Sequence, residues 1–330
     1  MMSHPVPGSK YYLPAETKRK KEIERRLTGT FETWGYDEVI PPTLVFAGFS
    51  SAAENAGLDE KAYRLVDRQG NLLTLRADLT IPVAHLAASL LDTQSPLRLY
   101  YLGNVFRAEE PGTGRQEEFF QAGVELIGAG GVAADLELTV LAVEALKNTG
   151  LDSFRVGIGD VSVVEGLLDG AGADPRAKDR ARAALSSRNY VEYRQTVQPL
   201  SPASPVQELL LDIPSMQGGS EILRRISSAV HLGVEVRKSL ADLSEVYRAL
   251  CDHGLEDHVY LDLSIMRGFR YYTGLVLEGY VPGLGHPVVG GGRYDRLLSQ
   301  FGKDAPAAGF AVNVDLLLTV PQSQARADLS

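Results

Sequence analysis

The chain has 330 residues, 44% of them hydrophobic and 23% charged, which is typical of a soluble globular protein with two domains or with one large domain carrying an insertion. Its formal net charge of −9 gives no global attraction to nucleic acid or anionic membranes, and its single cysteine, Cys251, excludes an internal disulfide and a cysteine zinc cluster. No stretch approaches the ~18 consecutive apolar residues of a membrane span, and residues 1–10 lack a signal-peptide core, so we expect a cytosolic protein.

The first predicted element is a helix over residues 15–34, opened by Pro14 and carrying apolar side chains at helical spacing. A basic run, Lys18-Arg-Lys-Lys21, lies at its start. Contact with RNA is one interpretation, but no aromatic side chain is interleaved with the run, which favours a solvated helix face. Val39-Ile40 is predicted to form a short strand that Pro41-Pro42 stops, as at a sheet edge or a subunit interface.

Residues 62–77 alternate as a β-hairpin whose turn is Arg68–Asn71, and apolar spacing predicts a helix directly afterwards. Two polar residues, Asp78 and Thr80, precede this helix. If they lie on a strand, their side chains face the same way. If Asp78 instead caps the helix, its role is structural. The sequence leaves both interpretations open.

Residues 97–106 and 119–127 are rich in aromatic and β-branched side chains, which predicts two strands joined by the polar turn Glu109–Gly114. Gln121 and Glu125 are four positions apart on the second strand, so they share one face of the sheet. A polar face of this kind is either the solvent-exposed side of an antiparallel sheet or a pocket for a small charged molecule.

The next part of the chain combines helix and strand patterns. A helix is predicted over Asp135–Gly150, and a strand over Phe154–Gly159 leads into a helix over Val161–Leu168. The string from Gly157 to Ser162 lacks the third glycine of a dinucleotide fingerprint, so we assign its glycines to a tight strand-to-helix turn. Residues 170–255 then show helical periodicity and predict a small inserted helical module, whose histidines lack metal-ligand spacing. We expect no metal and no cofactor.

The sheet pattern returns from residue 259 and continues to about residue 318. Arg267, directly before Gly268, places a cation at a point of close backbone approach, which suits a carboxylate or a phosphate. Three consecutive glycines, Gly290–Gly292, allow another backbone or a ligand to approach closely. Residues 321–330 are expected to form a frayed polar tail.

Several of these segments, in order, resemble the motifs of class II aminoacyl-tRNA synthetases, with the closest likeness to histidyl-tRNA synthetases over about residues 10–320. WGYDEVIPPTLVF resembles motif 1, whose prolines lie at the dimer interface of that family, and FRAEEPGTGRQEEFFQAGVELIG resembles motif 2. TLRADLT is similar to the segment that holds the amino group of histidine. MRGFRYYTG and GGGRYDRL resemble the histidine-specific signature and the glycine-rich strand after it, and AAGFAVNVDLLL occupies the place of motif 3.

This resemblance implies an α+β fold in which a six-stranded antiparallel sheet is flanked by helices, within a homodimer. Residues 1–169 and 256–320 would form the class II synthetase-like core. Residues 170–255 would form a helical insertion and residues 321–330 a polar tail, with no anticodon-binding domain.

The resemblance also implies a ligand pocket. Arg107, with Glu109, would face an adenylate-type phosphate, and Arg267 would meet a carboxylate or phosphate oxygen. The residues that would surround the amino group and imidazole of the ligand are Asp78, Thr80, Gln121 and Glu125, with Tyr271 and Tyr272 lining the imidazole end.

The chain departs from the synthetase pattern where catalysis is concerned. Motif 3 of class II enzymes ends with an arginine that clamps the γ-phosphate of ATP, and this chain has Leu316 there. The loss of one such preorganised cation costs at least ~10²–10³ in rate. The motif 2 region carries Glu110, Glu117 and Glu118 in place of basic residues, which makes a poor RNA surface, and Arg270 replaces an acidic residue of the histidine signature.

A histidine pocket without adenylation or tRNA-binding residues is similar to the profile of the ATP phosphoribosyltransferase regulatory subunits, a family of histidyl-tRNA synthetase paralogues. The resemblance implies a non-catalytic subunit, required for the first step of histidine biosynthesis and for feedback by histidine. Its partner would be a short-form catalytic subunit in a hetero-oligomer, with no tRNA and no membrane contact. Two alternatives stay open: a histidyl-tRNA synthetase-like enzyme that still activates histidine, and a histidine-dependent ligase.

Overall fold

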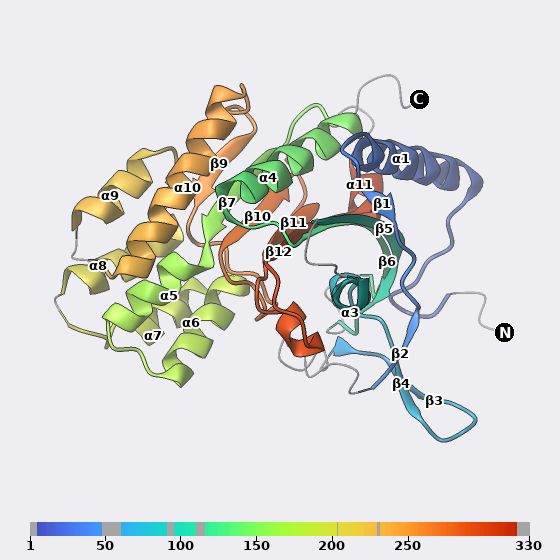
Figure 1. Ribbon diagram of the computed structural model, residues 1–330, viewed down its shortest axis with the longest axis horizontal. Coiled ribbons are helices and arrows are strands. Elements are labelled where there is room, and N and C mark those ends of the chain that lie inside the picture. Colours follow the sequence, from blue (N-terminus) through green and yellow to red (C-terminus); the bar gives the residue numbers. More distant parts are fainter. Residues whose placement is uncertain are drawn as a thin grey trace.

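A large mixed sheet forms the centre of the computed structural model, which describes residues 5–47, 61–90, 96–109, 116–202, 204–229 and 232–321. Within these ranges the sheet has nine strands in the order β1-β5-β6-β12-β11-β10-β7-β9-β8 (Figure 1). The strands are β1 (Asp37–Glu38), β5 (Leu97–Phe106), β6 (Glu118–Ile127), β7 (Arg155–Asp160), β8 (Gln217–Gly218), β9 (Val259–Asp262), β10 (Leu275–Tyr280), β11 (Val289–Arg293) and β12 (Ala307–Asn313). Most of the predicted turn at 109–114 and of the predicted tail lies outside the described residues.

Among the six central strands, from β5 across to β7, every adjacent pair is antiparallel, which confirms the six-stranded antiparallel core that the resemblance implied. The longest pairing joins β5 to β6, in register from Leu97 opposite Ile127 to Phe106 opposite Glu118. Both strands contain the aromatic and β-branched residues that suit a pleated surface packed on both faces.

The edges of the sheet were not predicted in full. β1 pairs in parallel with β5, one or two residues before the predicted strand at Val39-Ile40. At the other edge β9 pairs in parallel with β7, and the short β8 then pairs with β9. The predicted hairpin at 62–77 is confirmed, but it belongs to a second small sheet in the order β2-β4-β3, which projects from the large one (Figure 1). Its strands are β2 (Leu44–Phe46), β3 (Arg64–Val66) and β4 (Leu72–Leu75).

Helices cover the two faces of the large sheet and bury separate hydrophobic clusters. α1 (Pro14–Thr33) and α4 (Gly131–Asn148) lie along one face, where Leu27, Phe31 and Tyr100 pack together (Figure 1). α3 (Thr80–Leu90) lies on the opposite face with the 3₁₀ helix at Leu298–Phe301. Because side chains alternate along β5, Tyr100 points to the first cluster and Tyr101 to the second.

The segment predicted as a helical insertion is indeed helical. It contains α6 (Pro175–Ser186), α7 (Tyr190–Val197), α8 (Pro205–Asp212), α9 (Glu221–Ala229) and α10 (Val234–Asp252), preceded by α5 (Val161–Gly170). α10 packs on both α4 and α5, and one hydrophobic cluster runs from the sheet into these helices (Figure 1). An independent insertion domain therefore stays a prediction. None of the helices in the described ranges is long and apolar enough to cross a membrane.

The glycines of the partial dinucleotide fingerprint do not form the predicted tight turn. Gly157 and Gly159 lie inside β7, where a Cβ at Gly157 would come within 2.9 Å of the Tyr260 ring. At Gly159 a Cβ would overlap the carbonyl oxygen of Asp262. These glycines allow β9 to approach β7 closely, and the turn into α5 depends on Asp160, whose Oδ1 accepts the Ser162 N–H at 2.8 Å.

Candidate functional site

A cavity opens on the α3 face of the large sheet, above the middle of β6 and β12. The empty space inside it, together with the space at its open mouth, is about 400 Å³. It is lined by Asp78, Thr80, Tyr101, Arg107, Gln121, Arg267, Phe269, Tyr271, Tyr272, Gly290, Tyr294, Gly309, Phe310 and Ala311. Strands, the start of α3 and the loop before β10 thus each supply part of one pocket.

The structure brings seven of the nine sequence-predicted site residues to this lining: Asp78, Thr80, Arg107, Gln121, Arg267, Tyr271 and Tyr272. The polar face of β6 therefore faces a pocket rather than bulk solvent. Glu125 lies directly beneath, bonded to two of the lining tyrosines. Glu109 is not part of the lining. Its carboxylate lies 3.6 Å from Lys61, and its backbone N–H donates to Glu117.

Asp78 lies before α3 and not on a strand, so of the two interpretations left open the structure supports the helix-start role, and the same side chain also lines the pocket. Its Oδ1 accepts the backbone N–H of Ile81 at 3.2 Å, in the first turn of α3, while Oδ2 accepts from the Tyr271 hydroxyl at 3.5 Å on the pocket side. Burial raises the pKa of Asp78 to about 6, although the nearby Arg107 guanidinium lowers it. The helix start thus fixes a pocket carboxylate in place.

Glu125 is almost completely buried, with 1% of its surface exposed. It accepts hydrogen bonds from the hydroxyls of Tyr101, at 3.2 Å, and Tyr294. Burial raises the pKa of Glu125 to about 8, against the hydrogen bonds from Tyr294 and Thr80, which lower it. A carboxyl group that keeps its proton offers both an O–H donor and an acceptor to a polar group of a ligand.

Arg107 is a preorganised cation on the pocket wall. Its Nε donates to the carbonyl of Ala77 at 2.7 Å, and its guanidinium carbon lies 5.2 Å from the ring centroids of both Phe119 and Phe269. Contact with two aromatic faces stabilises the cation and restricts its rotamer. This position suits a ligand carboxylate or phosphate.

Arg267 is the second pocket cation and is already paired. Its Nη1 donates to Glu278 Oε1 at 3.2 Å, and its guanidinium lies 5.9 Å from the ring centroid of Tyr272. A Cβ at Gly290 would overlap this guanidinium, which explains one of the three consecutive glycines. Arg267 Nε is buried and has no hydrogen-bond partner among the described residues.

Sequence reasoning missed Tyr101, Tyr294 and Phe269. Tyr101 lies on β5 opposite Gly123, where a Cβ would come within 2.5 Å of the Tyr101 hydroxyl oxygen, so the glycine makes room for the ring. That glycine, between Gln121 and Glu125 on the polar face, was the signal that could have revealed a large partner on the neighbouring strand.

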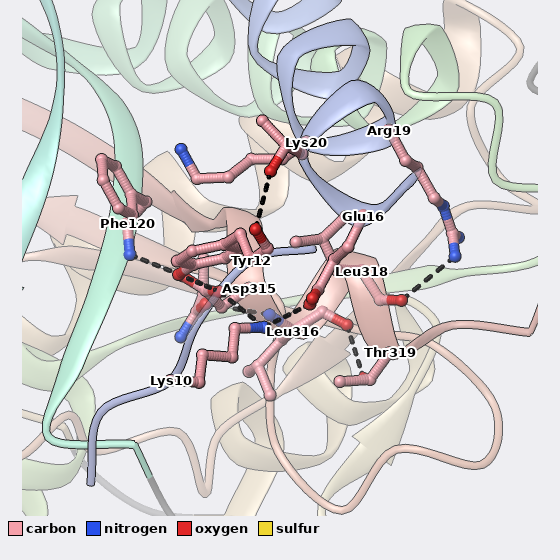
Figure 2. Close-up of polar contacts among 12 residues, drawn as sticks. Lys10, Tyr12, Glu16, Arg19, Lys20, Phe120, Asp315, Leu316, Leu318 and Thr319 are labelled. Atoms are coloured by element: carbon pink, nitrogen blue, oxygen red, sulfur yellow. Dashed lines mark hydrogen bonds and ion pairs between the residues drawn. The ribbon is translucent and has the colours of Figure 1, made fainter. Parts of the chain in front are cut away.

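The C-terminal helix α11 (Val314–Thr319) lies where the resemblance implied a γ-phosphate arginine (Figure 2). Leu316 occupies that position and packs partly buried against the main hydrophobic cluster. Beside it, Asp315 accepts the Tyr12 hydroxyl at 2.6 Å and the Phe120 N–H at 2.7 Å, and lies 3.2 Å from Lys10 Nζ. Asp315 therefore attaches the N-terminal segment to β6 and α11.

Half of the basic run in α1 is not a solvated face, which corrects that prediction. Arg19 donates to the carbonyls of Leu318, at 3.1 Å, and Val320, at 2.8 Å, at the end of α11 (Figure 2). Lys20 is buried, with its ammonium 3.3 Å from the Phe120 ring centroid and paired with Glu24. Neither cation is therefore placed to contact RNA. Within the described part of the chain, no group of three metal-ligating side chains converges.

Comparison with known proteins shows the family and the fold of the chain. A family model described as histidyl-tRNA synthetase matches residues 8–317. An ATP phosphoribosyltransferase regulatory subunit from Moorella thermoacetica is 45% identical over 96% of this chain and 82% of the relative. A solved structure titled as an ATP phosphoribosyltransferase regulatory subunit/histidyl-tRNA synthetase from Bacillus halodurans is 38% identical with a TM-score of 0.88, covering 96% of this chain and 83% of that one.

A second solved structure, a histidine–tRNA ligase subunit from Alicyclobacillus acidocaldarius, is 30% identical with a TM-score of 0.83 and covers 98% of both chains. The class II synthetase-like fold is therefore shared along almost the whole described chain.

Proposed function

The chain belongs to the family of ATP phosphoribosyltransferase regulatory subunits, which share the histidyl-tRNA synthetase fold, and we propose that its pocket is the histidine receptor of that complex. The protein is a regulatory subunit that serves the first step of histidine biosynthesis. A regulatory subunit needs a site for the signal and a surface for the enzyme.

The observation that carries the proposal is a pocket that combines polar acceptors with two arginines, in a chain whose α11 has Leu316 in place of the phosphate-binding arginine. Asp78 and Thr80, with Gln121, offer acceptors for an amino group. Arg107 and Arg267 offer cations for a carboxylate.

The imidazole of histidine would lie against the rings of Tyr271 and Tyr272. These rings also border the charged groups, because the Tyr271 hydroxyl donates to Asp78 and the Arg267 guanidinium lies 5.9 Å from the Tyr272 ring centroid. Glu125, bonded to Tyr101 and Tyr294, would form a hydrogen bond with a ring nitrogen. Carboxyl groups, two cations and aromatic rings within one pocket match an amino acid with a polar aromatic side chain.

We propose that the subunit is itself non-catalytic. Leu316 cannot neutralise the γ-phosphate of ATP, and the adjacent Asp315 is held by Tyr12 and by the Phe120 N–H. Glu117 and Glu118 place negative charge in the segment that resembles motif 2, where phosphates and tRNA would be repelled. The catalytic residues would lie on a short-form partner subunit, in the cytosol.

Feedback would operate by differential affinity. Histidine can inhibit the complex only if it binds one arrangement of the subunits more tightly than another. A coupling free energy of about 1–3 kcal/mol is typical for such regulation.

We also propose a homodimer within the hetero-oligomer. The segment that resembles motif 1 and the small sheet beside it expose large apolar side chains: Ile40, Leu44, Phe46, Val66 and Leu72. A cluster of this size in a soluble protein marks an interaction surface.

Reconstitution tests the function directly. Adding the protein to a short-form ATP phosphoribosyltransferase should activate phosphoribosyl-ATP formation, and histidine should inhibit the mixture. The proposal is wrong if mixing leaves the activity unchanged.

Calorimetry tests the pocket separately. Glu125→Ala removes the buried carboxyl group and should weaken histidine binding by ~10-fold, the scale of leaving one buried polar group without its hydrogen bond. Unchanged affinity would place the effector at another site.

The second candidate function is activation of histidine by adenylation, which the retained Arg107 and Arg267 favour. Pyrophosphate exchange with histidine and ATP separates the two functions. Brisk exchange would assign an enzyme, whereas a regulatory subunit gives none above background.

A further inference from the structure

Two arginines, one from the pocket and one from the helical segment, share a single carboxylate. Glu278 on β10 accepts from Arg267 Nη1 at 3.2 Å through Oε1 and lies 3.6 Å from Arg188 Nη2 through Oε2. The Tyr280 hydroxyl donates to Glu278 and accepts from Arg188. We call Arg188, Glu278 and Arg267 the Glu278 bridge. It connects the pocket with the corner between α6 and α7.

The backbone at Arg188 gives an independent sign that its side chain matters. Arg188 has φ of +56°, in the left-handed region that a residue with a Cβ disfavours. It follows the end of α6, a place where glycine is the usual residue. Here the residue is an arginine, and its guanidinium lies 4.9 Å from the Tyr280 ring centroid. A strained backbone at a residue that contacts the pocket's ion pair points to a functional role.

At its other end the bridge reaches the ligand position. Arg267 lines the pocket, and the absence of a side chain at Gly290 leaves room for its guanidinium. A Cβ at the adjacent Gly268 would lie 3.3 Å from Ser186 Oγ, so the loop before β10 also packs against the end of α6. Arg267 can therefore interact with Glu278 and with a ligand carboxylate. A change in the position of Arg267 would alter the contacts at the end of α6.

We propose that Arg188 is a positioning residue that couples the pocket to the helical segment through Glu278. The inference rests on the proposed function, because it requires a ligand carboxylate at Arg267. When that carboxylate engages Arg267, Glu278 loses part of its cationic partner. The side chain of Glu278 is only 16% exposed, so it then depends on Arg188.

Two consequences follow by linkage. Arg188 favours ligand binding, because it supplies the cation that Glu278 needs when Arg267 turns to the ligand. Equally, the ligand strengthens the contact between Glu278 and Arg188 and holds the α6–α7 corner more tightly. The helical segment thereby receives a signal that depends on pocket occupancy.

A double-mutant cycle with L-histidine tests the coupling by calorimetry. Arg188→Gly suits the left-handed backbone and deletes the guanidinium, and it should weaken histidine binding at least ~5-fold. In a Glu278→Gln background the same change should alter affinity less than ~2-fold, because a neutral amide needs no cation. Arg188→Lys should restore part of the affinity, and the exposed Arg180→Ala should match the wild type. Equal losses in both backgrounds overturn the inference.

A second arm needs no ligand. Arg267→Met imitates the withdrawal of Arg267 from Glu278, and amide exchange by mass spectrometry reports on residues 184–197. Arg188→Gly should accelerate exchange there at least ~5-fold more in the Arg267→Met background than in the wild type. Equal acceleration overturns the bridge. If histidine fails to bind the wild type, the proposed receptor role is wrong. The amide-exchange experiment then still tests the Glu278 bridge. If histidine binds with equal losses in both backgrounds, the bridge alone fails.

Discussion

At the scale of single residues, Glu125 is a deeply buried carboxyl group that can titrate. Burial raises its pKa from 4.5 to about 8, so the folded protein keeps the proton over a pH range in which the unfolded chain has lost it. Wherever the folded state binds more protons, stability falls as pH rises. The contribution is fully present below about pH 4.5 and is lost as pH rises to about 8.

Glu125→Gln replaces this carboxyl group with an amide that cannot titrate. Between about pH 5 and pH 8 the wild-type free energy of unfolding should fall more steeply, by up to about 1.4 kcal/mol per pH unit. Urea unfolding at a series of pH values measures the difference between the two slopes. Asp160, whose pKa burial also raises, contributes equally to both proteins and cancels. Parallel curves would contradict the assignment of the proton to Glu125.

Gly309 on β12 is needed because its neighbour on β6 is Glu125. A Cβ there would overlap Glu125 Oε2 and lie 2.5 Å from the carbonyl oxygen of Val124. Gly309→Ala should therefore destabilise the protein by about 1–3 kcal/mol, the usual cost of overpacking, and should weaken histidine binding. Thermal unfolding and calorimetry measure the two effects.

The matched control is Gly29→Ala in α1, where nothing lies within 4 Å of the added methyl group. Alanine is the better helix former, so this variant should gain about 0.5–1 kcal/mol. Similar stability of the two variants would show that the β12 position tolerates a side chain.

At the scale of elements, the N-terminal segment is fixed to α11 through one carboxylate. Tyr12→Phe removes the hydroxyl that donates to the buried Asp315 at 2.6 Å. A hydrogen bond to a buried charge contributes about 1.5–3 kcal/mol, so the unfolding free energy should fall by that amount. The neighbouring Tyr11→Phe, at an exposed ring, is the control and should be neutral. If both variants lose the same stability in denaturant unfolding, the hydrogen bond from Tyr12 to Asp315 does not stabilise the protein.

Elements whose pattern is local could be predicted from the sequence, and elements that depend on distant partners could not. The β5–β6 hairpin and α4 follow from aromatic and apolar periodicity within one segment. β8 has two residues and is a strand only because it pairs with β9. Arg19 was assigned to solvent for the same reason: the carbonyls it bonds lie 299 and 301 residues further along the chain.

The candidate site shows the same division. Spacing on β6 could place Gln121 and Glu125 on one face, and the family resemblance brought Asp78, Thr80 and Arg267 to them. The partners that set their chemistry come from three-dimensional packing. Tyr294 bonds Glu125 across 169 residues, and Glu278 was not considered because nothing local marks it as the partner of Arg267.

At the scale of the whole molecule, the small sheet and the motif 1 segment expose apolar surface that a monomer would leave in water. Phe46 and Ile40 are 59% and 81% exposed. Because burying an unpaired charge in an apolar interface is costly, a carboxylate at position 46 opposes association. Phe46→Glu should convert the proposed homodimer to a monomer in light scattering coupled to gel filtration, with the fold intact by circular dichroism.

The control for this surface has to be equally exposed and apolar but elsewhere on the molecule. Val191 on α7 is 70% exposed, and Val191→Glu should leave the dimer unchanged. If both variants stay dimeric, the small sheet is not the interface. If Phe46→Glu alone is monomeric yet still binds histidine, the pocket is complete within one chain.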